Sequence, residues 1–217
     1  MFNSLRPRRF FLILAWIACL PAACAFAPRA SREPLVDIRE ISKDIVVDFP
    51  YATDRNFTHR TLYPVNRCLL RASVAKRLAL VQSDLAPQGL GLKLWDCYRP
   101  LSIQKKLWEL VPNPDYVADP KRGSRHNRGA AVDVTLVDSG SRPLEMPTDF
   151  DDFSPKAHRD YPQLDTKVLD NRRRLEHAMR RRGFSGLKTE WWHFDAVGWE
   201  RYPLLDIPLN DALEAAP

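Results

Sequence analysis

The chain has 217 residues, of which 45% are hydrophobic and 28% are charged, so it has enough apolar material for one sizeable core and we expect a single domain. Its formal net charge is +6, and loss of Arg6, Arg8 and Arg9 with an N-terminal signal would lower that charge to +3. A net charge this small gives no argument for binding nucleic acid, and we expect no nucleic-acid partner.

The N-terminus has the pattern of an export signal. A basic start is followed by the apolar run 10–20 and by Ala23-Cys24-Ala25, the small-x-small pattern of a signal-peptidase site. An apolar run of this length is too short to span a bilayer comfortably. We therefore expect residues 1–25 to be a cleaved signal, the mature protein to have no stable membrane span, and its location to be a bacterial periplasm. Two variants stay open: a twin-arginine signal, and a lipoprotein anchored through Cys24.

After the signal, residues 26–44 are polar and contain Pro and Arg, so we predict a short leader before a catalytic domain over residues 45–217. The cysteines agree with an oxidising compartment. Cys68 and Cys97 are an even pair after the signal, and a single disulfide is expected. Two buried free thiols are the alternative. Neither cysteine lies in a C-x-x-C pair, which argues against zinc binding by these thiols.

The predicted elements alternate between helix and strand. Apolar residues at helical spacing predict helices over residues 72–86, 103–110 and 164–182. Short apolar or alternating runs predict strands over residues 91–98 and 130–136, the second buried on one face only. Because these elements show no regular βαβ rhythm, we predict an α+β fold. We expect one compact domain with a small, mostly antiparallel sheet flanked by helices.

Two segments far apart in the sequence hold residues with metal-binding chemistry. They are Ser124-Arg-His126-Asn-Arg-Gly129-Ala-Ala-Val-Asp133 and Glu190-Trp-Trp-His193. His126, Asp133 and His193 are the ligand types of a catalytic zinc site, which leaves a fourth position open, and a neighbouring Glu190 can take a proton from water. The alternative is an ordinary buried His–Asp network without metal.

The spacing of Glu190 and His193 poses a problem for a regular strand. Side chains three residues apart point to opposite faces, so a strand over 187–194 must bulge, twist or end there. Trp191 and Trp192 have two interpretations: they pack in the core alone, or they also form a dry wall beside the metal.

Together with Asp96-x-Tyr98-Arg99-Pro100, these motifs resemble those of the D-alanyl-D-alanine dipeptidases, zinc peptidases that include the vancomycin-resistance dipeptidase. Tyr51-Ala-Thr-x-x-Asn56-Phe57 and Asn171-Arg-Arg-Arg-Leu175 match this family as well, so the resemblance covers most of the mature chain. The His/Asp/His pattern with its Glu is shared with related D,D-carboxypeptidases, whereas Tyr98-Arg99-Pro100 and the doubled Trp favour the dipeptidase branch.

The resemblance implies a zinc D,D-peptidase-like fold that hydrolyses the small peptide D-Ala-D-Ala to D-alanine. It implies one Zn²⁺ per chain, held by His126, Asp133 and His193. Glu190 would act as general base on the attacking water and then as acid to the leaving amine. Arg99 would donate hydrogen bonds to the oxyanion.

The resemblance also places Ser124, Tyr51 and Asp151 in the substrate pocket, with Asp151 pairing with the free ammonium of the substrate. Cys97 stands where a small residue is common in the family, and a bond to Cys68 would brace the loop that holds Arg99.

Two other functions stay open: a D,D- or L,D-carboxypeptidase acting on peptidoglycan peptides, and a non-catalytic protein that binds wall peptides or metal. Glu190 argues against the second, because a binding site needs no base. A periplasmic dipeptidase would meet D-Ala-D-Ala released from wall precursors, so recovery of D-alanine is expected. The sequence gives no indication of the oligomeric state.

Overall fold

A computed structural model describes residues 33–211 of the chain. The predicted signal over residues 1–25 and its Cys24 lie outside the described residues. Between residues 33 and 211, no helix combines the length and the apolar character needed to cross a membrane.

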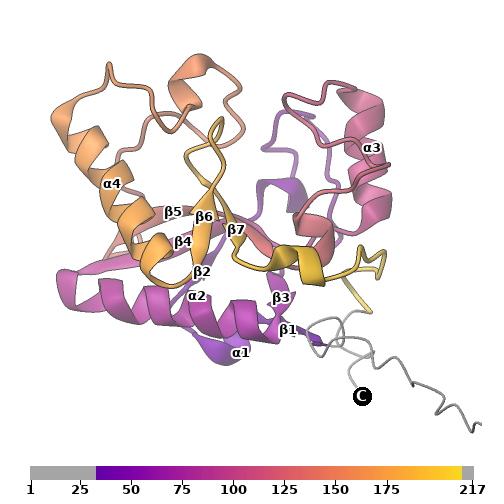
Figure 1. Cartoon of the computed structure of the whole chain (residues 1–217), viewed down its shortest axis with the longest axis horizontal. Coiled ribbons are helices and arrows are strands. Elements are labelled where there is room, and N and C mark those ends of the chain that lie inside the picture. Colours follow the sequence, from indigo (N-terminus) through magenta and orange to yellow (C-terminus); the bar gives the residue numbers. More distant parts are fainter. Residues whose placement is uncertain (1–32, 212–217) are drawn as a thin grey trace, which may run out of the picture.

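A five-stranded sheet forms the centre of the fold (Figure 1). Neighbouring strands are antiparallel except for the first pair, which is parallel. The strands of this sheet, in order across it, are β2 (Val46–Val47), β4 (Leu90–Asp96), β5 (Ala131–Asp138), β7 (His193–Ala196) and β6 (Phe184–Gly186). The prediction of an α+β domain with a mostly antiparallel sheet is confirmed.

Two long helices pack on this sheet. Helix α2 (Ala72–Leu85) contacts β4, and α4 (Thr166–Arg181) contacts β6 and α2. Helix α3 (Leu101–Leu110) lies away from both, on the opposite side of the molecule in Figure 1. The apolar stripes of α2 and α4 face inward at the spacing predicted from the sequence, whereas α3 buries Ile103 and Leu107 but exposes Leu110. The short 3₁₀ turns are η2 (Pro50–Ala52), η3 (Ala86–Gln88), η4 (His126–Arg128), η5 (Pro155–Ala157) and η6 (Trp199–Arg201).

The predicted start of the domain at residue 45 is wrong. Strand β1 (Leu35–Asp37) pairs with β3 (Leu69–Arg71) in a small antiparallel sheet, and α1 (Ile38–Ile41) follows directly. The side chains of Leu35 and Ile38 are buried in the main core. Part of the predicted leader over residues 26–44 therefore belongs to the folded domain. β1 and α1 are only three and four residues long, which is too short for a periodic pattern, so the sequence did not indicate these elements.

Strand β5 was predicted to bury one face, and this is also wrong. All its residues except Asp138 are buried. The strand lies in the middle of the sheet, between β4 and β7, and both of its faces are covered. The uncertainty over residues 187–194 is resolved by a loop: β6 ends at Gly186 and β7 begins only at His193, so Glu190 lies outside any strand.

A disulfide joins Cys68, just before β3, to Cys97, just after β4. The Cα atoms of the two cysteines are 5.3 Å apart, and both residues are buried. The bond links the chain that leads into α2 with the chain that leads from the sheet to Arg99.

Candidate active site

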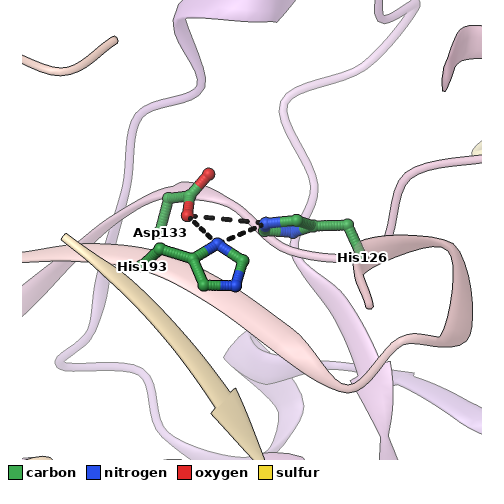
Figure 2. Close-up of side chains that lie close together, drawn as sticks. All are labelled: His126, Asp133 and His193. Atoms are coloured by element: carbon green, nitrogen blue, oxygen red, sulfur yellow. Dashed lines mark hydrogen bonds and ion pairs between the residues drawn. The ribbon is translucent and has the colours of Figure 1, made fainter. Parts of the chain in front are cut away.

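Three elements bring His126, Asp133 and His193 to one place. His126 begins the η4 turn, Asp133 lies in β5, and His193 is paired with Asp133 in the register of β5 and β7. Gly129 ends η4 with a left-handed backbone (φ 66°), and a Cβ there would overlap the side chain of Leu35. This glycine lets the chain reverse from η4 into β5, so that residues seven apart converge. Figure 2 shows the three side chains turned toward a common point.

The ligand atoms fit a tetrahedral zinc ion. Nε2 of His126 lies 3.2 Å from Nδ1 of His193, which lies 3.0 Å from Oδ1 of Asp133. Nε2 of His126 and Oδ1 of Asp133 are 3.4 Å apart. Zinc–ligand bonds of about 2.0–2.1 Å at tetrahedral angles separate two ligand atoms by about 3.3 Å, so the three atoms form one face of such a tetrahedron. Two histidines and a carboxylate are a ligand set of catalytic zinc sites, and the described residues supply three of the four ligands, so the fourth position is available to water or substrate.

Each histidine is oriented by a hydrogen bond from its other ring nitrogen. Nδ1 of His126 lies 2.7 Å from the main-chain oxygen of Cys97, and Nε2 of His193 lies 2.9 Å from Oδ1 of Asp195. If these nitrogens donate, the facing nitrogens present lone pairs to the metal position. Asp195 was not predicted from the sequence. The sequence could have indicated it, because residues two apart in a strand share a face, and this places Asp195 beside His193.

The electrostatics of this cluster favour a bound cation. Burial alone would disfavour charge here, but the two histidines hold the pKa of Asp133 well below its usual range. For His193, burial also disfavours the charged form and by itself lowers the pKa. Hydrogen bonds to Asp133 and Asp195 outweigh burial and raise the pKa of His193 to about 10. The site therefore attracts positive charge between these groups, and a divalent metal can supply it.

Glu190 lies beside the three candidate ligands without joining them. Its Oε2 is 3.8 Å from Nδ1 of His193, and burial raises the pKa of its carboxyl above the ordinary value. Among the described residues, the cluster with metal-binding geometry contains only His126, Asp133 and His193. Glu190 is therefore placed to handle protons next to the open coordination position.

Arg99 is fixed in a buried network. Its guanidinium donates from Nη2 to Oδ2 of Asp96 at 2.5 Å and from Nη1 to Oε1 of Gln104 at 2.8 Å, and Nε approaches Asp96 and the hydroxyl of Tyr63. Burial opposes the charge, but Asp96 raises the pKa of Arg99 well above its usual value. Within the described part of the chain, each terminal nitrogen keeps one N–H for another acceptor. No role was predicted from the sequence for the residues that hold Arg99, namely Asp96, Tyr63 and Gln104. Only the three-residue spacing of Asp96 and Arg99 could have indicated that these two residues pair.

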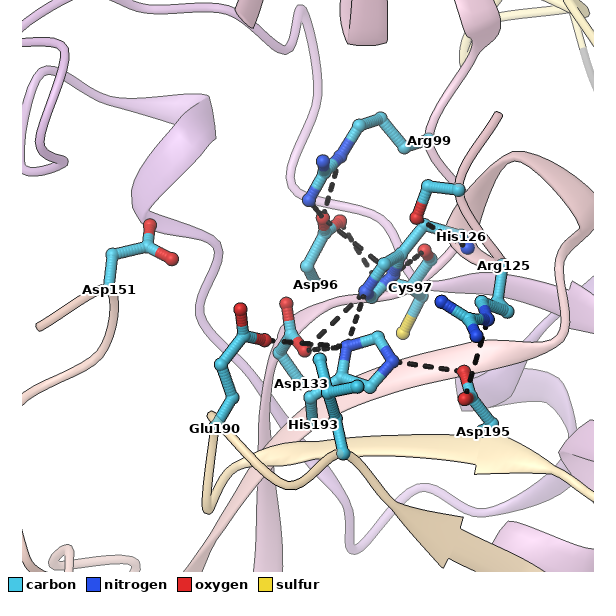
Figure 3. Close-up of polar contacts among 12 residues, drawn as sticks. Asp96, Cys97, Arg99, Arg125, His126, Asp133, Asp151, Glu190, His193 and Asp195 are labelled. Carbon is cyan, nitrogen blue, oxygen red and sulfur yellow. Dashed lines mark hydrogen bonds and ion pairs between the residues drawn. The ribbon is translucent and has the colours of Figure 1, made fainter. Parts of the chain in front are cut away.

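Tyr51 and Asp151 meet on another side of the site. The Tyr51 hydroxyl donates to Oδ2 of Asp151 at 2.8 Å. Asp151 has a left-handed backbone (φ 57°), a conformation that costs energy for a residue other than glycine. Burial raises the pKa of its carboxyl well above the usual value, and the charges of Asp133 and Glu190 raise it further. Figure 3 shows this carboxylate turned toward the side on which Glu190 lies.

Ser124 supports the first ligand. Its side chain is buried, and its Oγ accepts a hydrogen bond from the main-chain N–H of His126 at 3.2 Å. The backbone N–H of Ser124 donates to Oδ1 of Asn127 at 2.7 Å, which closes the turn.

One cavity of about 630 Å³ is lined by the three candidate ligands, by Glu190 and Arg99, and by the residues predicted to line the substrate pocket. The aromatic residues Phe57, Tyr116 and Phe153 also line it, and the rings of Tyr116 and Phe153 stack with centroids 4.7 Å apart. Trp191 and Trp192 are fully buried and do not line the cavity. They pack behind it with Trp95 and Phe150. The predicted site residues that line it are Tyr51, Arg99, Ser124, His126, Asp133, Asp151, Glu190 and His193.

Residues 31–207 match the family described as D-ala-D-ala dipeptidase. The chain is similar to the D-alanyl-D-alanine dipeptidase of Escherichia coli (strain K12), with 37% identity over 171 residues, which is 79% of this chain and 89% of the relative. It is similar to the D-alanyl-D-alanine dipeptidase of Enterococcus faecium, with 31% identity over 198 residues, 79% of this chain and 96% of the relative. A crystal structure of a vancomycin-resistance D,D-dipeptidase in complex with a D-Ala-D-Ala phosphinate analogue overlaps with a TM-score of 0.39 at 19% identity. The overlap covers 76% of this chain and 66% of that one. The family match and the identity to two full-length relatives show that this chain belongs to the D-Ala-D-Ala dipeptidase family.

Proposed function

We propose that this protein is an exported zinc dipeptidase that hydrolyses free D-alanyl-D-alanine to two molecules of D-alanine. The observation that carries the proposal is the position of Glu190, beside the open corner of the His126–Asp133–His193 cluster and in the same cavity as Asp151. Relatives that carry the name D-alanyl-D-alanine dipeptidase support the choice of substrate.

The cluster of His126, Asp133 and His193 would hold the metal. Zinc supplies Lewis acidity there, which polarises a carbonyl and makes water more acidic. Glu190 takes the proton of the attacking water and returns it to the leaving amine. Arg99 donates its free N–H groups to the oxygen that becomes negative as the carbonyl carbon turns tetrahedral. Because Asp96 and Gln104 already hold the guanidinium, little reorganisation is needed when that charge develops.

Asp151 provides the selection for a dipeptide. A half-buried carboxylate without a positive partner is unfavourable, and a substrate ammonium would stabilise its charged form. A peptide extended at its N-terminus has an amide in place of that ammonium and cannot satisfy Asp151. Tyr51 holds the carboxylate in place through its hydroxyl.

Location outside the cytoplasm rests on the signal pattern over residues 1–25 and agrees with the Cys68–Cys97 disulfide. In a periplasm the enzyme would meet D-Ala-D-Ala released from wall precursors and return D-alanine.

The test compares two substrates with the purified mature chain in the presence of zinc: free D-Ala-D-Ala, and a pentapeptide that ends in the same two residues. The proposal expects zinc-dependent cleavage of the dipeptide and no release of D-alanine from the pentapeptide. Comparable cleavage of the pentapeptide would identify a carboxypeptidase. Zinc binding with no turnover of either substrate would identify a non-catalytic binding protein.

A further inference from the structure

The loop between β6 and β7, residues 187–192, carries Glu190 and leads into His193 (Figure 1). Its position therefore sets the proposed base and one ligand together. Main-chain groups outside Arg159 hold it at three points: Leu187 N–H donates to the oxygen of His193 at 3.2 Å, Trp191 N–H donates to the oxygen of Ala157 at 3.0 Å, and the oxygen of Trp192 accepts from Val134 N–H at 3.1 Å. The other carbonyls of the loop need further donors, because unpaired buried carbonyls are costly.

Arg159, outside the loop, supplies those donors. Its Nε donates to the main-chain oxygen of Leu187 at 3.1 Å. Its Nη2 lies at hydrogen-bond distance from the main-chain oxygens of Glu190 (3.0 Å), Trp191 (3.0 Å) and His193 (2.9 Å). The main-chain N–H of Arg159 also donates to the oxygen of Lys188 at 2.9 Å.

The guanidinium is itself held in place. It lies over the ring of Phe194, with Cζ 4.4 Å from the ring centroid, and its Nη1 is 3.8 Å from Oε2 of Glu176 on α4. Burial lowers the pKa of Arg159 to about 10, so the group stays charged at neutral pH. Hydrogen bonds from a charged donor are stronger than those from a neutral one.

Gly186 makes room for this contact. A Cβ at Gly186 would overlap the guanidinium of Arg159. The backbone of Gly186 is not in the left-handed region, so the position could accept alanine without backbone strain. The absence of a side chain there is explained by the approach of Arg159.

We propose that Arg159 is a positioning residue for catalysis, which fixes Glu190 and His193 relative to Asp133 by binding the carbonyls of the 187–193 segment. It lines no part of the cavity and contacts neither the proposed ligand atoms nor the Glu190 carboxylate, so it acts through the main chain. Lysine cannot replace it fully, because an ammonium has no planar fork to reach several carbonyls at once.

Arg77 provides a matched control at the far end of the same two strands. Its Nη1 donates to the main-chain oxygens of Gly183 (3.0 Å) and Val197 (3.4 Å), and its Cζ lies 5.5 Å from the ring centroid of Phe184. Arg77 thus makes the same kinds of contact as Arg159, but to carbonyls remote from Glu190. A purely structural role for Arg159 would make the two arginines equivalent.

The experiment compares Arg159→Met, Arg159→Lys, Gly186→Ala and Arg77→Met with the wild type. It measures zinc affinity by competition with a chelating dye, kcat and KM for D-Ala-D-Ala, and the melting temperature. Arg159→Met should bind zinc about 10- to 100-fold more weakly, the usual effect of losing a group that orients a ligand. Its kcat should fall at least about tenfold with KM within about threefold, because Tyr51, Arg99 and Asp151 lie on other segments. Arg159→Lys and Gly186→Ala should show intermediate losses, and Arg77→Met should lower only the melting temperature.

Wild-type zinc affinity and kcat in Arg159→Met, with a lower melting temperature as in Arg77→Met, would overturn the proposal. If Arg159→Met does not fold, Gly186→Ala and Arg159→Lys decide by the same criteria, and wild-type values in both would overturn it. The kinetic part rests on the proposed function, whereas zinc affinity does not. A wild type that binds zinc without cleaving D-Ala-D-Ala would refute the function and leave the test of Arg159 intact.

Discussion

Two walls of the cavity are held in different ways. The sheet wall is defined by Asp133 and His193, which strand register holds together, and by His126 on the adjoining η4 turn. Hydrogen bonds to Cys97 and Asp195 orient the two histidines. The loop wall, defined by Tyr51, Asp151 and Phe153, lies outside the sheet, on the short η2 turn and on the loop around residues 151–153. The hydrogen bond between Tyr51 and Asp151 joins its segments, together with aromatic contacts such as that between Phe153 and Tyr116.

From this comparison we expect the metal geometry and the choice of substrate to be separable in this fold. Metal ligands must be held within a few tenths of an ångström, which a sheet provides, whereas recognition of a substrate terminus can be supplied by a loop. Changes in the sheet wall should abolish the reaction, and changes in the loop wall should alter which peptide is cleaved.

The largest expected effect comes from the ligands of the sheet wall. His126→Ala, Asp133→Ala and His193→Ala should each remove most of the roughly one zinc per chain and reduce activity to background. Elemental analysis of the purified variants checks this. His177→Ala, at an exposed position on α4, is the control and should keep its zinc. Undiminished zinc in the three ligand variants would refute the assignment.

Glu190→Gln should separate base from ligand. The amide keeps the size of the side chain but cannot accept the proton, so activity should fall at least about 100-fold while zinc content stays near that of the wild type. Kinetic assays and metal analysis on the same preparation measure both. Activity within a few-fold of the wild type would exclude Glu190 from the mechanism.

Arg99→Ala should lower kcat by about 10- to 100-fold and raise KM by less, because the proposed contact strengthens as the oxyanion forms. This change also leaves the buried Asp96 carboxylate without its charged partner, so the melting temperature should be recorded alongside the kinetics. An effect confined to KM would make Arg99 a substrate-binding residue only.

The disulfide should affect stability and have the smallest effect on turnover. Closing a loop between cysteines 29 residues apart should stabilise the fold by about 3 to 4 kcal/mol in the chain-entropy model. We expect protein recovered from an oxidising compartment to contain the Cys68–Cys97 bond and to melt at a lower temperature after reduction. Mass spectrometry of unreduced digests identifies the linked peptides. Free thiols in such protein would contradict the prediction.

The sequence was sufficient for the sheet wall because metal binding restricts residue types. Only a few side chains bind zinc, so His126, Asp133 and His193 could be recognised before their positions were known. The fold class followed from apolar periodicity, which marked α2, α3 and α4 and the strands β4 and β5. The family resemblance, and not spacing, supplied Tyr51, Ser124 and Asp151.

The supporting groups could not be predicted, because their partners are main-chain atoms or distant residues. Arg159 binds carbonyls, and every residue has a carbonyl, so no pattern of residue types marks the contact. The burial of both faces of β5 depends on neighbours that only the tertiary structure defines. The β1 strand lacked a periodic signal because it is only three residues long.

The most direct test of the two-wall account is the ratio of kcat/KM for free D-Ala-D-Ala to that for N-acetyl-D-Ala-D-Ala, measured in the wild type, Glu190→Gln and Asp151→Asn. The wild type should strongly prefer the free dipeptide, because acetylation removes the ammonium that we propose Asp151 binds. Glu190→Gln should slow both substrates and leave the ratio unchanged, whereas Asp151→Asn should lose much of the preference. Equal cleavage of the two substrates by the wild type, or an unchanged ratio in Asp151→Asn, would contradict the account.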